Sequence, residues 1–408
     1  MTDDNAKGWA SVPTTTCPVC DAHTPIAEFC GSCGARSAQA RHRRRADGPA
    51  WLRLRAYAAS PGEHVLIPSL TGSLFPRLPH RSRGSFRLGL IALAVLLVAI
   101  AALRWQGPLI GLCALGLPLL FVIYLNESDA FADVPIRILV AVVVLEGVLG
   151  VSYSLFTGAI IAATYDDVLG TPLTVGEQLA AVLAIPSGEV LVMFAPVVLV
   201  RLLRPGVREA MDGFAVGALA ALCFCAAGTF TRLAPQFETG LVADDRPITD
   251  LLVTAIIAGV AIPLTAAAVT GLFGATLWFR PRTNAHRRSP RYGVIAPLPA
   301  LVVGLLAYVG IGWLDIRWLP QGAAAASYTL IAVLALLALR IGTHIVLMSE
   351  VPEDTEPDTT VLCPQCDHIV PDLAFCPSCG VAGRASSPTS RRIRRAQRPV
   401  PVTAPDGP

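Results

Sequence analysis

Residues 107–125, GPLIGLCALGLPLLFVIYL, carry no charged side chain over a length that can cross a bilayer as one helix. Seven further apolar stretches of this kind occur at 87–104, 135–164, 178–203, 212–231, 250–279, 293–314 and 323–348. Of the 408 residues, 53% are hydrophobic and only 15% are charged, a composition that excludes an ordinary soluble domain. The sequence therefore predicts a mostly α-helical, polytopic membrane protein with about eight transmembrane helices.

Two of these stretches are long enough to tilt or break, namely 135–164 and 250–279. Proline adds a second reason for irregularity, because it removes a helical hydrogen bond and kinks the chain. Pro186 and Pro196 lie in the fourth stretch and Pro263 lies in the sixth. We expect kinks at these positions.

Arginines beside the stretches predict the orientation, because basic residues accumulate on the cytosolic side. One side carries Arg77, Arg81, Arg83, Arg87, Arg201, Arg204, Arg208, Arg280, Arg282, Arg287, Arg288 and Arg291. The other side carries only Arg104, Arg232, Arg246 and Arg317. The first side is predicted to be cytosolic. An even number of spans then places both termini in the cytosol, in a multi-pass protein of the cell (inner, or cytoplasmic) membrane.

A short polar motif occurs twice, outside the apolar region. Residues 17–34 are CPVCDAHTPIAEFCGSCG and residues 363–380 are CPQCDHIVPDLAFCPSCG. Both copies have the pattern CxxC, nine residues, CxxC, and they share the intervening aspartate, proline and phenylalanine as well. The agreement indicates an internal repeat.

Two CxxC pairs at this spacing are typical of a zinc ribbon, in which four thiolates close the tetrahedral shell of one Zn²⁺. A closed shell leaves no position for a reactive water, so each zinc is predicted to be structural. The predicted ligands of the two zinc ions are Cys17, Cys20, Cys30 and Cys33 in one copy, and Cys363, Cys366, Cys376 and Cys379 in the other. Disulfides are the alternative, but they require an oxidising compartment, whereas the predicted cytosolic location favours zinc.

The repeats and apolar stretches divide the chain into segments. These are a disordered N-terminus (1–16), zinc ribbon 1 (17–34), an Arg/Pro-rich cytosolic segment with partial order (35–86), the transmembrane helical domain (87–348), an acidic linker (349–362), zinc ribbon 2 (363–380) and a disordered basic tail (381–408). The basic clusters at 41–45 and 391–395 are interpreted as solvated flanks. Contact with anionic lipid or nucleic acid is the alternative.

The matched Phe29 and Phe375 offer each ribbon an apolar contact for the other. Because one bundle anchors both ribbons, we expect them to form a paired module that binds a protein partner. Two independent beads on flexible tails are the alternative.

Ionisable residues inside the stretches are costly in hydrocarbon and therefore mark functional or structural sites. The candidates are Glu146, Glu189, Asp212, Arg340 and His344. Asp212 and Arg340 are expected near the interfaces, where a long side chain reaches water. For Glu189, a functional site and a buried structural carboxyl both remain open.

The stretch IPSGEVLVMFAPVVLVRLLRPGVREAMDGFAVGALAALCFCAAGTF, residues 185–230, resembles the core of the PrsW family of intramembrane proteases. That family has EExxK on one helix and, on the next, DG followed by YGAxxGLGF and a glutamate. Here 189–193 aligns with EExxK, and Asp212, Gly213, Gly217, Ala218 and Phe224 align with the second helix. The resemblance covers about 120–345 and implies a PrsW-like bundle.

The chain departs from that pattern at most catalytic positions. Only Glu189 is retained, while Val190, Met193 and Gly228 replace the second glutamate, the lysine and the later glutamate. Ala266 stands where the family has a histidine. A single carboxylate without a base or ligand beside it does not support peptide hydrolysis.

Three functions follow as hypotheses. The favoured one is a non-catalytic PrsW-like membrane scaffold or sensor, a pseudoprotease that displays paired cytosolic zinc ribbons to a cytosolic or membrane protein. The second is an active intramembrane peptidase with a site rebuilt around Glu189 and His344. The third is a transporter or channel lined by Glu146 and Glu189. The bilayer is a partner in all three, and nucleic acid is a further candidate partner.

Overall fold

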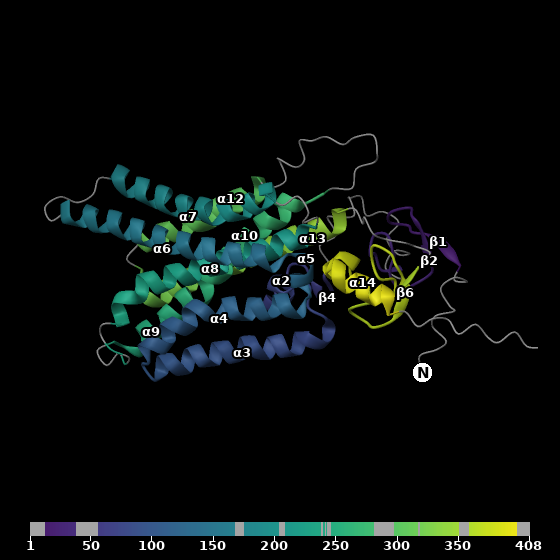
Figure 1. Ribbon diagram of the computed structural model, residues 1–408, viewed down its shortest axis with the longest axis horizontal. Helices are drawn as coiled ribbons and strands as arrows, with labels where there is room; N and C mark the ends of the chain where they lie inside the picture. The colour runs from purple at the N-terminus through teal and green to yellow at the C-terminus, as the bar shows by residue number, and fades with distance from the viewer. Residues whose placement is uncertain are drawn as a thin grey trace, which may run out of the picture.

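The computed structural model describes residues 13–37, 56–167, 175–203, 209–237, 240, 242, 246–280, 298–316, 319–350 and 359–397. Within these residues, eight helices are long and apolar enough to cross a membrane, which confirms the predicted fold class. The helices lie alongside one another in a bundle, and both cysteine-rich repeats lie together beyond one end of it (Figure 1). We call this the ribbon-side end and the opposite one the distal end.

The helices of the bundle agree closely with the apolar stretches of the sequence. They are α3 (His80–Ala102), α4 (Gln106–Glu127), α6 (Ile136–Asp167), α7 (Val175–Leu203), α8 (Ala210–Leu233), α9 (Ile248–Ile256), α10 (Ile262–Trp278), α12 (Leu298–Ile316) and α13 (Gln321–Ser349). The short α5 (Ala130–Asp133) joins α4 to α6, and the 3₁₀ turn η2 (Ala234–Phe237) follows α8.

The sixth span is interrupted, as its length and its proline suggest. A π-helical turn, η3 (Ile257–Ala261), separates α9 from α10, and Pro263 lies in the first turn of α10. Proline cannot donate the hydrogen bond that the preceding turn requires, so a wider turn relieves the conflict. By contrast, α6 is one continuous helix.

The centre of the bundle is the crossing of α8 and α10, and α8 is the most buried of the eight spans. Glycines on both helices allow their backbones to touch. A Cβ atom on Gly213 would lie 2.6 Å from Cε3 of Trp278 and closer still to the carbonyl oxygen of Gly274. Gly217 meets the backbone of Thr270 in the same way. Small residues are therefore required along this contact.

Residues 56–78, which we call the inserted segment, fold against the ribbon-side end of the bundle. They form the hairpin β3 (Ala56–Tyr57) and β4 (Ser60–His64) and the short helix α2 (Leu70–Leu74). Tyr57 and Phe75 are fully buried. Within the segment 35–86, for which partial order is expected, residues 56–78 are ordered and packed into the core. Residues 38–55 lie outside the described residues.

The predicted disorder of the C-terminal tail is wrong for its first part. Residues Gly383–Ala385 form the 3₁₀ turn η4 and Pro388–Ala396 form helix α14, which Ser387 caps by accepting a hydrogen bond from Ser390 N. Arginines of α14 are held by carboxylates instead of being solvated. The pairs are Arg391 with Glu209, Arg394 with Asp367, and Arg395 with Asp372.

Candidate metal centres

The two repeats have the same local fold. Both ribbons begin before the predicted bounds: in ribbon 1 (residues 13–37), β1 (Thr14–Thr16) pairs with β2 (His23–Pro25), and in ribbon 2 (residues 359–382), β5 (Thr360–Leu362) pairs with β6 (Ile369–Pro371). The predicted disorder of residues 1–16 is therefore wrong for 13–16, and the end of the predicted linker belongs to ribbon 2. Each hairpin carries the first CxxC pair, and a second turn carries the other.

Each CxxC turn closes with a residue of positive φ. In ribbon 1, Asp21 N donates to Cys17 O at 2.9 Å and Gly34 N donates to Cys30 O at 2.8 Å. Their φ angles are 55° and 68°. Ribbon 2 repeats both turns, and the left-handed conformation explains why glycine follows the last cysteine in both copies.

The four thiols of each ribbon converge, with all sulfur atoms within 4.8 Å of one another. In ribbon 1 the Sγ atoms of Cys17 and Cys33 lie 3.8 Å apart, and in ribbon 2 those of Cys363 and Cys379 lie 3.7 Å apart. A disulfide would require about 2.05 Å. A tetrahedron with metal–sulfur distances of about 2.3 Å has edges of about 3.8 Å. Each set is therefore spaced to hold one metal ion.

The surroundings of these thiols favour ionisation at Cys30 in ribbon 1 and at Cys366 and Cys376 in ribbon 2. Hydrogen bonding from Cys33 lowers the pKa of the Cys30 thiol to about 4, although burial opposes it. In ribbon 2, hydrogen bonding from Cys363 lowers the pKa of Cys366. Metal binding requires thiolates, so a lowered thiol pKa favours metal binding at these sites.

The ribbons pack against each other in a reciprocal arrangement. Phe29 N donates to Pro377 O at 3.0 Å, and Phe375 N donates to Gly31 O at 2.9 Å. Each phenylalanine ring also covers the glycine that follows the other ribbon's last cysteine. A Cβ atom on Gly34 would lie 2.7 Å from Cδ1 of Phe375, and one on Gly380 would lie 2.6 Å from Cδ1 of Phe29. The structure thus has the paired arrangement and not independent beads.

Ribbon 2 also contacts the bundle and the inserted segment. Ala382 N donates to Ala58 O at 2.8 Å, and Arg384 pairs with Glu350 at 3.1 Å at the end of α13. Farther on, Thr389 N donates to Asp133 Oδ1 at 3.0 Å, which fastens α14 to the turn between α4 and α6. The ribbon pair is therefore anchored to the bundle at several points.

Three of the proposed intramembrane residues hold the inserted segment, which in turn contacts ribbon 2. Asp212 forms a 2.7 Å ion pair with Arg77 of the inserted segment, and both side chains are almost completely buried. His344 Nδ1 accepts a hydrogen bond from Ala58 N at 3.2 Å. The fully buried Arg340 donates to Glu63 at 2.8 Å, and its guanidinium lies 4.2 Å from the centre of the Tyr57 ring.

The other two candidates lie farther from the ribbons. Glu189 is half-buried on α7, where Arg232 and Asp315 interact with it electrostatically. Glu146 on α6 is fully buried, and neither of its carboxylate oxygens has a hydrogen-bond partner among the described residues. The structure does not bring these two carboxylates together with His344.

Sequence reasoning missed several ion-pair partners at this end of the bundle. The sequence indicates Arg77 only as a topology signal and Glu350 only as part of the acidic linker, and it gives no role to Glu209. Each lies next to an apolar stretch, where a lone charge is usually solvated, so its burial depends on contacts from distant segments. Cys113, Cys223 and Cys225, the remaining cysteines, lie on spans and belong to neither metal-binding cluster.

The chain matches no family model, no curated protein and no solved structure. Its two four-cysteine clusters and its eight apolar helices are therefore interpreted from its own residues.

Proposed function

We propose that the protein is a non-catalytic membrane scaffold or sensor, with a PrsW-like bundle, whose paired ribbons lie in the cytosol and bind a protein partner. The observation that carries this proposal is the reciprocal packing of Phe29 and Phe375, together with the anchoring of ribbon 2 to the bundle. A rigid pair of ribbons offers one continuous surface. A partner binds such a surface without first ordering two separate modules.

Zinc is the metal we propose for both sites. Four thiolates in a tetrahedral set suit Zn²⁺, and the closed shell assigns the ion a structural role. In this interpretation Cys17, Cys20, Cys30 and Cys33 hold one ion, and Cys363, Cys366, Cys376 and Cys379 hold the other. Elemental analysis of freshly purified protein is expected to give two zinc ions per chain.

The positions of Glu189 and His344 favour scaffold over peptidase. Helix α7 ends at Leu203 on the ribbon side, and Glu189 lies about 21 Å before that end along the helix axis. Helix α13 ends at Ser349 on the same side, and His344 lies only about 8 Å before that end. His344 is also engaged with the inserted segment. A rebuilt catalytic pair would need these groups within hydrogen-bond reach of one substrate.

The partner proposal is tested by crosslinking in native membranes, with the double variant Phe29→Ala/Phe375→Ala compared with the unaltered chain. The variant is expected to keep its metal and to lose a protein that the unaltered chain crosslinks through its ribbons. The variant Glu189→Gln is tested in parallel and is expected to retain both the metal and the crosslinked protein. Release of a cleaved membrane substrate that Glu189→Gln abolishes would establish the peptidase instead.

Orientation is tested separately with an impermeant thiol reagent on intact cells. A cysteine at Gly240 is expected to be labelled from outside, and one at Ser289 is expected to be protected. The reverse pattern would place the ribbons outside the cytosol and would favour disulfides over zinc.

A further inference from the structure

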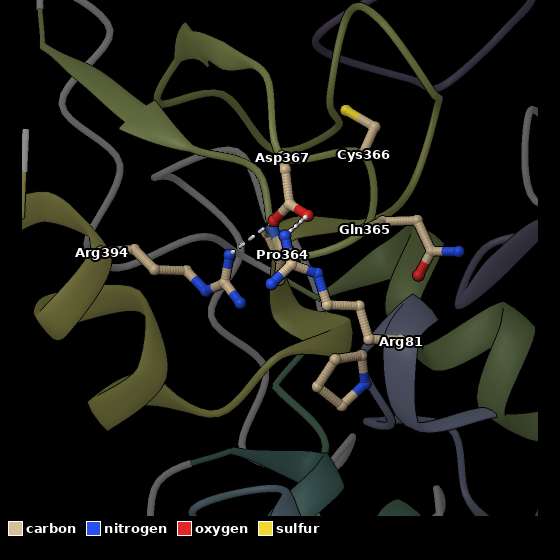
Figure 2. Close-up of a pocket in the computed structure, with 7 residues that line it drawn as sticks. Arg81, Pro364, Gln365, Cys366, Asp367 and Arg394 are labelled. Carbon is tan, nitrogen blue, oxygen red and sulfur yellow. Dashed lines mark ion pairs between the residues drawn. The ribbon is translucent and has the colours of Figure 1, made fainter. Parts of the chain in front are cut away.

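A pocket of about 400 Å³ lies where α3, ribbon 2 and α14 meet. Figure 2 shows Arg81 from the start of α3 and Arg394 from α14 pointing toward the carboxylate of Asp367. The two guanidinium–carboxylate distances are 3.3 Å and 3.7 Å. Pro79, Pro364, Gln365 and Cys366 complete the lining of this pocket.

The guanidinium groups of Arg81 and Arg394 have N–H donors that their contacts with Asp367 do not use. A strong guanidinium–carboxylate hydrogen bond is about 2.7–2.9 Å long, and both distances here exceed that range. The Arg81 side chain is 85% exposed, so most of its N–H groups face outward. Two cations share one carboxylate, which leaves a net positive charge for a further anion.

Comparison of the two repeats shows that this charge belongs to one copy only. Asp21 occupies the same turn in ribbon 1, with the same φ of 55° as Asp367. Among the described residues, Asp21 forms no ion pair of the kind that Asp367 makes. In addition, Val19 of ribbon 1 is replaced by Gln365 in ribbon 2. The polar pocket is therefore a feature of the ribbon that touches the bundle and not of the ribbon fold itself.

The position of Arg81 relates the pocket to the bilayer. Arg81 is the first residue of the first membrane span, so its side chain lies at the level of lipid head groups. Leu88 and Val95 follow it at seven-residue intervals and share its face of α3. Both are exposed, by 67% and 60% respectively, and form an apolar strip that leads from the pocket along the span.

We propose that this pocket binds the head-group phosphate of an anionic phospholipid between Arg81 and Arg394, with an acyl chain along Leu88 and Val95. The guanidinium groups match the phosphate oxygens in charge and geometry. The apolar strip selects a lipid over a free phosphate ion. This inference rests on the pocket and on the membrane span, so it stands independently of any protein partner.

The test is a lipid titration of the purified, metal-loaded full chain in detergent, followed by native mass spectrometry. Phosphatidylglycerol is compared with phosphatidylcholine, and Arg81→Gln/Arg394→Gln is compared with Arg392→Gln. Arg392 is an exposed arginine of α14 that does not line the pocket. Because each basic residue at the surface contributes about a five-fold factor, the double variant is expected to bind phosphatidylglycerol roughly 30-fold more weakly. Arg392→Gln is expected to change binding less than two-fold.

Several results would overturn the proposal. One is equal affinity for the two lipids, and another is an equal loss in the Arg392→Gln variant, which would indicate diffuse charge in place of a site. Competition by inorganic phosphate at the lipid's own concentration would identify a free-anion site instead. Metal content is measured in every variant, and the proposal is abandoned if binding is lost only where the metal is lost.

Discussion

Arg77 and Asp212 are buried charged residues at the edge of the membrane domain, and each is compensated by the other. Their 2.7 Å ion pair leaves side-chain exposures of only 1% and 5%. Glu209 lies 3.7 Å from the same guanidinium but is already paired with Arg391. A buried pair of this kind adds little net stability, yet removing one partner leaves an uncompensated buried charge. Asp212, a candidate for function in the sequence, has a structural role here.

Asp212→Asn is therefore expected to destabilise the protein by about 3–5 kcal/mol. Thermal unfolding in detergent measures the effect as a lowered midpoint. The matched control is Glu28→Gln, which breaks the exposed pair with Arg36, whose side chains are 51% and 50% exposed. That change is expected to cost less than about 1 kcal/mol. Equal effects of the two substitutions would contradict the buried-pair interpretation.

At the scale of elements, α8 and α10 depend on glycine for their close approach. Gly213 and Gly217 face Gly274 and Thr270 through backbone contacts, a packing mode in which van der Waals contact replaces the hydrophobic effect inside a bilayer. The resemblance to the PrsW core that the sequence suggests rests partly on these same α8 glycines. Helix packing is thus a sufficient physical reason for their presence.

Gly217→Val is expected to separate α8 from α10 and to destabilise the fold by about 3 kcal/mol, because the added atoms meet backbone and not a flexible side chain. The control is Gly158→Val on α6, where a Cβ meets nothing within 4 Å. Unfolding midpoints in detergent compare the two. A Gly217→Val protein as stable as the control would show that the crossing tolerates a wider spacing.

The junction between α13 and η4 is predicted to respond to pH. Burial raises the pKa of Glu350 to about 7, with Arg384 opposing the rise and Glu209 adding to it. We call the state in which residues 383–396 pack against the bundle the docked state. The pKa of Glu350 in this state is above the ordinary value of 4.5, so protonation of its carboxyl favours docking. This contribution is complete below about pH 4.5 and is lost as the pH rises through 7.

Between pH 6 and pH 8, hydrogen exchange of residues 383–396 is therefore expected to accelerate, by up to about ten-fold per pH unit below 7 and less above it. Glu350→Gln is expected to remove this added dependence after correction for intrinsic exchange. A wild-type profile that matches the variant would show that Glu350 does not govern docking.

On the scale of the whole molecule, the ribbons, the inserted segment and α13 form one connected structure. Ala382 N of ribbon 2 donates a hydrogen bond to Ala58 O, and the neighbouring Tyr57 hydroxyl lies 2.9 Å from the Thr343 hydroxyl of α13. Each ribbon is too short to bury a sizeable core, so we expect a bound metal ion to supply most of its folding free energy. We therefore expect loss of metal to affect the end of the bundle as well.

Removal of both metal ions with a chelator is expected to raise hydrogen exchange throughout the ribbons and at residues 56–64 and 388–396. The centre of the bundle, α8 with α10, is expected to stay protected, because its packing contains no metal-dependent contact. Deuterium uptake by peptide provides the measurement, and re-addition of zinc provides the control. Unchanged protection at 56–64 would mean that the inserted segment is held by the bundle alone.

The number of spans, the two four-cysteine sets and the break near Pro263 follow from the sequence alone. The signals for them are local: a run of apolar residues, a fixed spacing of thiols, and a proline within a helix. Each needs no knowledge of distant residues. Eight spans and two metal-binding clusters are accordingly present where the sequence predicts them.

Only the tertiary structure decided what the charged residues do. Arg391, Arg394 and Arg395 form a basic cluster in the sequence, whereas in the fold Arg391 pairs with the distant Glu209, and Arg394 and Arg395 pair with Asp367 and Asp372 of ribbon 2. His344 and Asp212 likewise find their partners in the inserted segment. Whether a charge is solvated, paired or available to a ligand depends on which distant group lies beside it, and such long-range pairing leaves no periodic trace in a single sequence.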